Sequence, residues 1–424
     1  LKMKNLNLGF VGLSHLGLSY LAASVQMKYN VLGIDEDKDR LNQLKEYKII
    51  YNEPLLKEII QNNKKKINFS DKFEDLRKCQ IVFISEDIKT DKNGNSDYRK
   101  INKLIKNTIK VLNKKAVLII LSQVIPGFTR KVNFDKTRLY YQVETLIFGN
   151  AIKRALKPER IIVGCIDPKK KINNNLKKYL SCFKSPVLKM TYESAELTKI
   201  SINMFLTSTI STTNMLSSIS SKISADWNEI IPALKLDERI GQKAYLKPGL
   251  GISGGNLERD ISTLKKILKK NKEPLSMVNA FKKNSEYAKS WVYRILKKEG
   301  VLKKNSHKVG LLGLAYKTNT NSIKNSPSIV LLKKIFKTEC YVYDPVVKLS
   351  SSFRNCTQVK NIKKIIDFSN VIILMTPWQE FKKLNLLLNN KKKQKTILID
   401  PFGMIQRERI KRHNIKYFTL GKHI

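Results

Sequence analysis

A glycine-rich turn near the start of the chain has the residue types and spacing of a dinucleotide-binding site. The apolar run 6–11 leads into Gly12-Leu13-Ser14-His15-Leu16-Gly17, and Asp35 ends the next β-rich run, 23 positions after Gly12. Gly12 allows a tight turn, Gly17 allows close packing of the following helix, and the N-terminus of that helix receives a pyrophosphate. Asp35 is placed to accept hydrogen bonds from ribose hydroxyls. We therefore expect these positions, together with Ser14, to bind a dinucleotide.

Ser14 departs from this motif, because a second glycine normally stands at its position. A Cβ atom there crowds the pyrophosphate, so we expect a weakened cofactor affinity. Asp35 favours NAD over NADP, whose additional phosphate it repels. The alternative is a Rossmann-like domain that binds no dinucleotide, since a fold can outlast its function. His15 is interpreted as incidental rather than catalytic.

The elements around this turn alternate between short β-rich runs and helical patterns, which is typical of doubly wound parallel sheets. The strands expected in the first half are 6–11, 30–34, 81–85, 117–121 and 160–164. A second series is expected at 308–312, 340–343, 370–375 and 396–399. The sequence therefore predicts an α/β protein with two Rossmann-like domains.

One long helix is predicted between the two series, over residues 194–230, because apolar residues recur there at helical spacing without Gly or Pro. This helix is more hydrophobic than a free surface helix should be. That property suits a contact between subunits and equally a buried spine between domains. We expect a homodimer.

The net charge is strongly positive, with 81 Lys and Arg against 35 Asp and Glu, or +46 at pH 7. Such an excess raises nucleic acid or an anionic membrane as partners. The lysines are scattered along the whole chain, however, and no stripe of interleaved aromatic residues could stack bases. We interpret them as solvated surface residues and expect neither a specific nucleic-acid partner nor a membrane partner.

The five cysteines show neither paired nor metal-type spacing, so we expect a reducing compartment and no metal site. Residues 4–24 resemble a secretory signal superficially, but Gly12, Ser14 and Gly17 have a better use inside a fold. No run approaches the roughly 18 uninterrupted apolar residues of a membrane span. A cytoplasmic location is expected.

Further segments, together with the glycine turn, make the chain resemble the UDP-glucose/GDP-mannose dehydrogenase family over nearly its whole length. They are Tyr51-Asn52-Glu53-Pro54, Ser122-Gln123-Val124-Ile125-Pro126-Gly127, Gln142-Val143-Glu144 with Gly149-Asn150-Ala151, Glu196-Leu197 with Lys199, Arg239-Ile240-Gly241 and Tyr343-Asp344-Pro345. The resemblance implies an NAD-binding domain over 1–190, a central helical dimerisation domain over 191–300 and a nucleotide-sugar-binding domain over 301–424. It also implies synthesis of polysaccharide precursors.

The resemblance implies that NAD oxidises a primary alcohol of a nucleotide sugar twice, to a carboxylate. Lys199 and Asn203 then stabilise the developing alkoxide, because preorganised charges act strongly in a dry site. Glu144 activates the water that hydrolyses a thioester, and Asp260 orients water and Lys199. Taken alone, both Lys199 and Glu144 would be interpreted as ordinary surface residues.

The cysteine that forms this thioester is missing. The segment 249–260 resembles the nucleophile loop of the family, but Asn256 occupies the cysteine position, and an amide cannot replace a thiolate. We expect this loop to face the nicotinamide ring beside Lys199 and Glu144. Other family positions have also changed, at Gln123, Phe148, Ile88, Lys89 and Phe402.

Other residues take their expected roles from the resemblance alone. Ser122 is expected to bind the cofactor, and the remaining positions are expected to bind the nucleotide sugar, with Arg239 reaching it from the partner subunit. These positions are Arg239, Lys247, Gly251 and Lys317.

Three hypotheses follow for the function. The first is an NAD-dependent nucleotide-sugar dehydrogenase that acts on the C6 primary alcohol of a UDP- or GDP-hexose and is impaired, or stops at the aldehyde, without the thiol. The second is an inactive family member that keeps nucleotide binding and dimerisation for a regulatory or scaffolding role. The third, nucleic-acid binding, rests on composition alone.

Overall fold

A computed structural model describes residues 6–91, 94–303, 307–388, 395–406, 408 and 414–422. The chain consists of two units, Leu1–Ile202 and Asn203–Ile424. The division into three domains therefore stays a prediction. Among the helices of the described residues, none combines the length and the apolar character that crossing a membrane requires.

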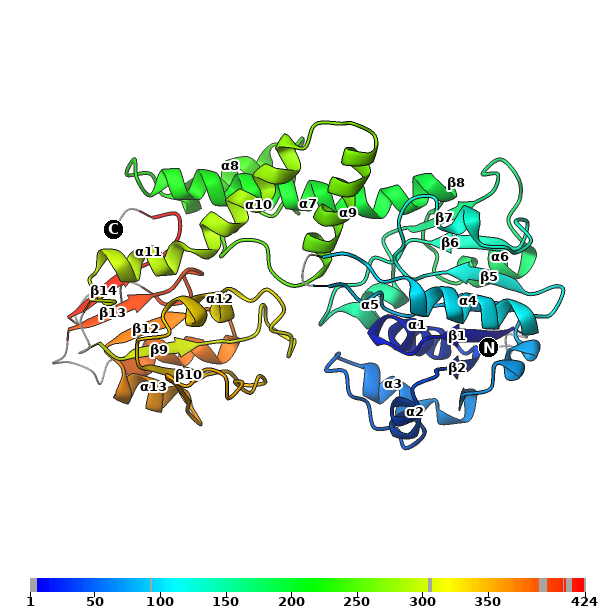
Figure 1. The fold of residues 1–424 in the computed structure, drawn as a ribbon, viewed down its shortest axis with the longest axis horizontal. Coiled ribbons are helices and arrows are strands. Elements are labelled where there is room, and N and C mark those ends of the chain that lie inside the picture. The colour runs from blue at the N-terminus through cyan, green and yellow to red at the C-terminus, as the bar shows by residue number, and fades with distance from the viewer. Residues whose placement is uncertain are drawn as a thin grey trace. The chain divides into compact units, whose positions relative to one another are not determined.

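The first unit contains an eight-stranded sheet with the order β3-β2-β1-β4-β5-β6-β7-β8 (Figure 1). Its strands are β1 Asn7–Val11, β2 Asn30–Ile34, β3 Ile67–Ser70, β4 Ile81–Ile84, β5 Val117–Ile120, β6 Leu139–Gln142, β7 Ile161–Cys165 and β8 Val187–Thr191. All neighbours are parallel except β6 and β7. The expected α/β class and doubly wound sheet are thus confirmed.

The strands that we did not predict in this unit are β3, β6 and β8. They are short, and in β8 the first three residues are exposed, so no clear apolar pattern marks it. The antiparallel turn from β6 to β7 has a useful consequence. Residues 143–160 start and end at the carboxyl edge of β6, the edge where the parallel strands present their loops.

Alternate residues of the strands build two apolar layers. On β4, Ile81 and Phe83 enter one core, whereas Val82 and Ile84 enter the core on the opposite face. Helices α1 and α5 pack side by side on one face (Figure 1). The helices before residue 190 are α1 His15–Gln26, α2 Lys38–Lys45, α3 Leu56–Asn62, α4 Arg99–Val111, α5 Ala151–Leu156 and α6 Asn174–Ser181.

The long helix predicted over residues 194–230 is shorter than expected. Helix α7 runs over Tyr192–Ser220, and a separate helix, α8, follows over Trp227–Leu236. Ser224, in the turn after α7, has a φ of +62°, and the carboxylate of Asp226 then caps α8 by accepting from Asn228 N at 2.8 Å. This prediction is wrong at its C-terminal end, because local capping outweighs a continuing apolar pattern.

The second unit contains a six-stranded parallel sheet with the order β11-β10-β9-β12-β13-β14. Its strands are β9 Val309–Leu312, β10 Cys340–Tyr343, β11 Cys356–Gln358, β12 Val371–Leu374, β13 Thr396–Ile399 and β14 Ile415–Phe418. Its further helices are α9 Asn256–Lys270, α10 Ser276–Lys289, α11 Trp291–Lys298, α12 Pro327–Lys334, α13 Ile362–Phe368 and α14 Leu384–Leu387. The strands before β14 take the same spatial order as β3, β2, β1, β4 and β5 of the first unit.

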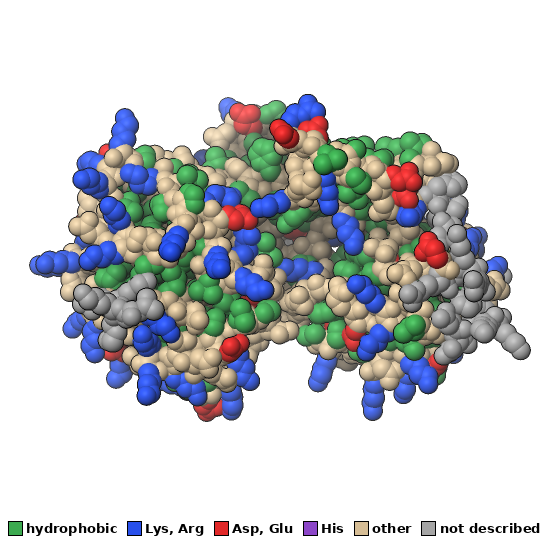
Figure 2. Space-filling model, turned by 180° about the vertical axis from the view of Figure 1, so that it is seen from behind, with side chains coloured by type: hydrophobic (Ala, Val, Ile, Leu, Met, Phe, Trp, Pro, Cys, Tyr) green, Lys and Arg blue, Asp and Glu red, His purple; other side chains and the backbone are tan. Residues whose placement is uncertain are grey.

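Lys and Arg side chains are scattered over the visible face of both units, without gathering on one element (Figure 2). This distribution agrees with the interpretation of the lysines as solvated surface residues.

Candidate functional site

The turn between β1 and α1 depends on two glycines. Gly12 has a φ of +91°, and its amide donates to Ile34 O at 2.8 Å. A Cβ atom on Gly12 would lie 2.7 Å from Glu86 Cβ, and one on Gly17 would lie 2.0 Å from Gly12 O. Neither position can hold a larger residue without distortion. This close-packed turn before a helix N-terminus fits a dinucleotide pyrophosphate.

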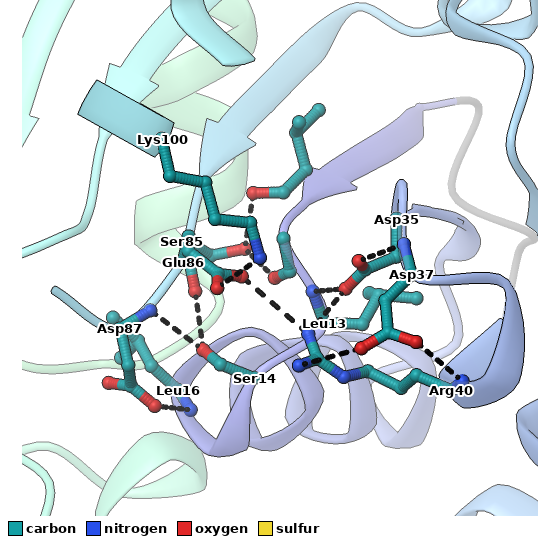
Figure 3. A network of polar contacts seen from close by, with 12 residues as sticks. Leu13, Ser14, Leu16, Asp35, Asp37, Arg40, Ser85, Glu86, Asp87 and Lys100 are labelled. Atoms are coloured by element: carbon teal, nitrogen blue, oxygen red, sulfur yellow. Dashed lines mark hydrogen bonds and ion pairs between the residues drawn. The ribbon is translucent and has the colours of Figure 1, made fainter. Parts of the chain in front are cut away.

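Ser14 fits the turn for a different reason. Its φ is −66°, an ordinary value for serine, so the backbone does not require a glycine there. Its hydroxyl donates to Ser85 O at 3.1 Å and accepts from Asp87 N at 2.9 Å (Figure 3). Ser14 therefore joins the turn to the loop after β4. The expected loss of cofactor affinity stays a prediction.

Asp35, at the end of β2, is buried beside the turn. Its carboxylate accepts from Leu13 N at 2.7 Å and from Asp37 N at 3.0 Å, and it forms an ion pair with Arg40 Nη1 at 2.7 Å (Figure 3). Sequence reasoning missed Arg40. Its place five residues after the acid, near the start of α2, was the available signal. Asp35 and Arg40 thus form a charged pair beside the turn.

Two acids in the loop after β4 were also missed. Glu86 is buried, and its carboxylate pairs with Lys100 Nζ at 2.5 Å. Burial raises the pKa of Glu86, and the hydrogen bond from Lys100 opposes this rise. Asp87 is exposed and stands beside α1. The predicted cofactor residue Ser122 donates its hydroxyl to Glu86 O at 2.7 Å, so it positions this acidic loop.

His15 has a structural role in the turn. It is buried, and its Nε2 lies 3.0 Å from a carboxylate oxygen of Glu53. Glu53 also accepts from Gly149 N at 2.8 Å and from Ala151 N at 2.7 Å. The ring of His15 stacks on Phe148 with centroids 4.2 Å apart. These contacts fasten the Tyr-Asn-Glu-Pro segment to the turn and to the start of α5.

Glu144 and Lys199, two predicted catalytic residues, form an ion pair in the first unit. The distance from Lys199 Nζ to Glu144 Oε1 is 2.7 Å, and Lys199 is buried. The other carboxylate oxygen of Glu144 accepts from Leu146 N at 3.0 Å. Burial raises the pKa of Tyr20, and the nearby Glu144 raises it further. This pair holds an oriented ammonium group, as the stabilisation of an alkoxide requires.

Asn203 and Asp260, two more predicted catalytic residues, meet in the second unit. The amide of Asn203 donates to the carboxylate of Asp260, and both residues are buried. Arg259 Nε lies 3.4 Å from the other oxygen of Asp260. Lys199 and Asn203 are four residues apart on α7, a spacing that places both on the same helix face.

Asn256 is the first residue of α9, and its side chain is exposed. Asp260 stands one helical turn later, which is the i, i+4 spacing of residues on one face. The preceding loop is shaped by Gly251, with a φ of +80°, and by Gly254, with a φ of +81°. Gly254 N donates to Lys324 O at 3.0 Å, so the loop packs against the segment after β9.

A second glycine turn follows β9. Gly313 has a φ of +99°, and its amide donates to Tyr343 O at 2.8 Å. Asp344 accepts from Leu314 N at 2.7 Å. The predicted substrate residue Lys317 lies in the same segment, with its Nζ 5.7 Å from the ring centroid of Tyr316. This turn is placed like the first one, at the carboxyl edge of its sheet.

Two predicted substrate residues lie on the surface of the second unit. Arg239 is paired with Asp237 of the same segment at 2.6 Å, and its side chain is 89% exposed. Lys247 is also exposed. The roles of these two residues stay predictions.

Three family models match the chain. Residues 6–182 match the NAD binding domain of the UDP-glucose/GDP-mannose dehydrogenase family. Residues 193–286 match the central domain of that family, and residues 310–407 match its UDP binding domain.

Curated proteins and solved structures agree with these matches. UDP-glucose 6-dehydrogenase of Rickettsia bellii is 28% identical, with 99% of this chain and 100% of that protein covered. UDP-glucose 6-dehydrogenase TuaD of Bacillus subtilis is 24% identical, with 97% and 92% covered. A UDP-glucose dehydrogenase from Pyrobaculum islandicum has a TM-score of 0.83 at 21% identity, with 98% of each chain covered, which supports the fold.

Proposed function

The chain belongs to the UDP-glucose/GDP-mannose dehydrogenase family, and we propose that it oxidises the C6 primary alcohol of a nucleotide sugar only as far as the aldehyde. NAD is the cofactor, and it accepts the hydride when it is bound. The observation that carries the proposal is Asn256, which begins α9 at the position where the family resemblance expects a nucleophilic cysteine.

The first oxidation needs groups that this chain retains. As a proton leaves the alcohol, negative charge develops on its oxygen, and a fixed cation and a hydrogen-bond donor stabilise that charge. Lys199 supplies the cation and Asn203 the donor. Glu144 holds the ammonium group of Lys199, and Asp260 holds the amide of Asn203, so neither has to reorganise during the reaction.

The second oxidation lacks its nucleophile. An aldehyde loses a hydride readily only after a nucleophile has added to its carbonyl carbon, and a thiolate is the efficient choice. The amide nitrogen of Asn256 is not nucleophilic, because its lone pair is delocalised into the carbonyl group. Among the described residues of the second unit, the cysteines are Cys340 on β10 and Cys356 on β11, not on the loop before α9.

The substrate class follows from the family and from the relatives. The C-terminal match is a UDP binding domain, and the cited relatives are named for UDP-glucose. We assign Lys317, Lys247 and Gly251 to the nucleotide sugar and Arg239 to the sugar of a partner subunit in a homodimer. Synthesis of polysaccharide precursors in the cytoplasm is the corresponding role.

The test is the yield of NADH per sugar for the natural chain and for Asn256→Cys. Each purified protein is given NAD with UDP-glucose, GDP-mannose or UDP-N-acetyl sugars. The natural chain is expected to form at most one NADH per sugar and an aldehyde that a hydrazine reagent traps. Asn256→Cys is expected to form two NADH and a carboxylate. Ser253→Cys, which places a thiol elsewhere in the same loop, is the matched control and should gain nothing.

Two results would contradict the proposal. Two NADH per sugar from the natural chain would show that the thiol is not needed. Binding of NAD without NADH formation from any of these sugars would favour an inactive family member that retains nucleotide binding. Such a member is the second candidate, because several other family positions, including Gln123 and Phe148, have also changed.

A further inference from the structure

The N-terminus of α1 is already contacted by an anion of this chain. The amide of Leu16, in the first turn of α1, lies 3.4 Å from Asp87 Oδ2 (Figure 3). Amides at a helix N-terminus carry positive partial charge, which is the reason that dinucleotide phosphates bind there. No acidic residue of α1 itself stands in its first turn. The carboxylate that reaches this end comes from the loop after β4.

Ser14 holds Asp87 in this place. Its hydroxyl accepts from the backbone amide of Asp87 at 2.9 Å and donates to Ser85 O at 3.1 Å. A glycine at this position would leave that amide without the hydroxyl. The serine that departs from the dinucleotide motif thus anchors the acid.

The basic groups near the turn are engaged by other acids. Arg40 pairs with Asp35 at 2.7 Å and lies 3.7 Å from Glu86, and Lys100 pairs with Glu86 at 2.5 Å. The charge of Asp87 is therefore not neutralised by either of these cations.

Two further ionisable groups face Asp87 from neighbouring elements, namely His15 of α1 and Glu144 of the segment after β6. His15 is held by Glu53, and Glu144 is held by Lys199. Asp87 itself is an exposed residue, and its carboxylate is held at this end of α1 by the contact with Leu16 N.

We propose that Asp87 is an internal competitor for the phosphates of NAD and that it sets a low affinity for the cofactor. The proposal rests on NAD as the cofactor, which the family shows, and not on any particular nucleotide sugar. A phosphate group that approaches α1 has to displace the carboxylate from Leu16 N and meets its negative charge. Adenosine, which has no phosphate, meets neither obstacle.

The experiment is calorimetric titration of the full-length chain and of Asp87→Asn with NAD, ADP-ribose and adenosine. Asparagine keeps the size of the side chain and removes its charge. The dissociation constants for NAD and ADP-ribose are expected to fall at least about fivefold, within the range of helix-terminus charge effects. The dissociation constant for adenosine is expected to stay the same.

Asp167→Asn is the matched control. Asp167 is partly exposed and follows β7, which runs antiparallel to β6, so it stands at the opposite edge of the sheet. This variant changes the net charge equally and should leave all three dissociation constants unchanged. Thermal unfolding of each variant shows whether it has folded.

Ser14→Gly provides a second measurement. Removing the hydroxyl releases the anchor of Asp87, so this variant should also tighten NAD binding. In the double variant with Asp87→Asn, the second change should add little, because the two residues act together.

Equal NAD affinity of the natural chain and Asp87→Asn would overturn the proposal. So would an equal gain for adenosine, since that would show a change unrelated to phosphate. Failure of both proteins to bind NAD would overturn it as well, because removal of the competitor should reveal binding. None of these results depends on turnover of a sugar, so they are distinct from failure of the proposed function.

Discussion

The chain builds one backbone arrangement twice, at the turn after β1 and at the turn after β9. In both, a glycine with positive φ donates its amide to the carbonyl that ends the neighbouring strand, at 2.8 Å. In both, an acid just after that strand accepts from the amide of the residue following the glycine, at 2.7 Å. The common geometry follows from the shared strand order of the two sheets.

The two acids nevertheless have different surroundings. Asp344 accepts from four backbone amides, those of Leu314, Ala315, Val346 and Val347, and lies 3.3 Å from Trp378 Nε1. All of these donors are fixed parts of its own domain. In the first turn, Asp35 accepts from two backbone amides, those of Leu13 and Asp37, and also pairs with the side chain of Arg40. Asp344 is therefore bound mainly by backbone amides, whereas Asp35 binds fewer of them and also pairs with a charged side chain.

The residues that pack against the two glycines differ in charge. A Cβ atom on Gly12 would touch Glu86, and one on Gly313 would touch Thr376. The next residues are Asp87 in the first case and Pro377 in the second. A phosphate at the second turn would therefore meet the uncharged residues Thr376 and Pro377. A phosphate at the first turn would meet two carboxylates. Equal backbones do not imply equal affinity for nucleotides.

The largest expected effect comes from removing the two acids. Asp344→Ala should lower the free energy of unfolding by about 3 kcal/mol or more, because it leaves several buried amides without an acceptor. Asp35→Ala should cost about 1–2 kcal/mol, because fewer buried amides lose their acceptor. Urea unfolding of both variants measures the difference. Equal losses in the free energy of unfolding would mean that the two acids stabilise their turns to the same extent, contrary to the comparison.

A smaller effect is expected from giving the second turn the charge of the first. Pro377→Asp places a carboxylate where Asp87 stands in the other domain. It should raise the dissociation constant for UDP about tenfold through repulsion, while NAD binding is unchanged. Pro377→Asn is the neutral control, and titration calorimetry measures both. An equal loss of UDP binding in the two variants would point to the backbone rather than to charge.

The smallest expected effect concerns Glu86, the buried acid that packs against Gly12. Burial raises the pKa of Glu86 in the fold despite Lys100, so its ionised form is less favourable there than in the unfolded chain. Glu86→Gln should therefore be more stable than the natural chain at pH 7. As the pH falls through the raised pKa, the natural chain gains protonated Glu86 and the difference should shrink. Thermal unfolding at several pH values checks this, with Glu46→Gln as an exposed control.

Local patterns were sufficient for part of the site. Gly12, Gly17 and Asp35 could be predicted because a tight turn, a close helix and a strand end impose residue types at short range. Glu144 and Lys199 pair with each other in the structure, and the catalytic roles that the resemblance assigned to them separately stay predictions. The same resemblance marked Asn256, although the catalytic consequence of that residue stays a prediction.

The acids after β4 illustrate what the sequence did not reveal. Glu86 and Asp87 are unremarkable in a list of residues, and they matter only because β4 pairs with β1 and carries them to the turn. Likewise, Ser14 was interpreted as a defect of the motif, whereas its hydroxyl joins two segments distant in the chain. The break between α7 and α8 was missed because the apolar pattern continues across it.

The sequence by itself determined the α/β class, the doubly wound sheets and the turn residues, because these depend on periodicity and on backbone constraints within a few positions. Only the tertiary structure decided which charges face the turn. Electrostatic effects act through space between residues far apart in the chain, and strand order alone brings Asp87 to the first residues of α1 while it places Pro377 at the corresponding point of the second domain.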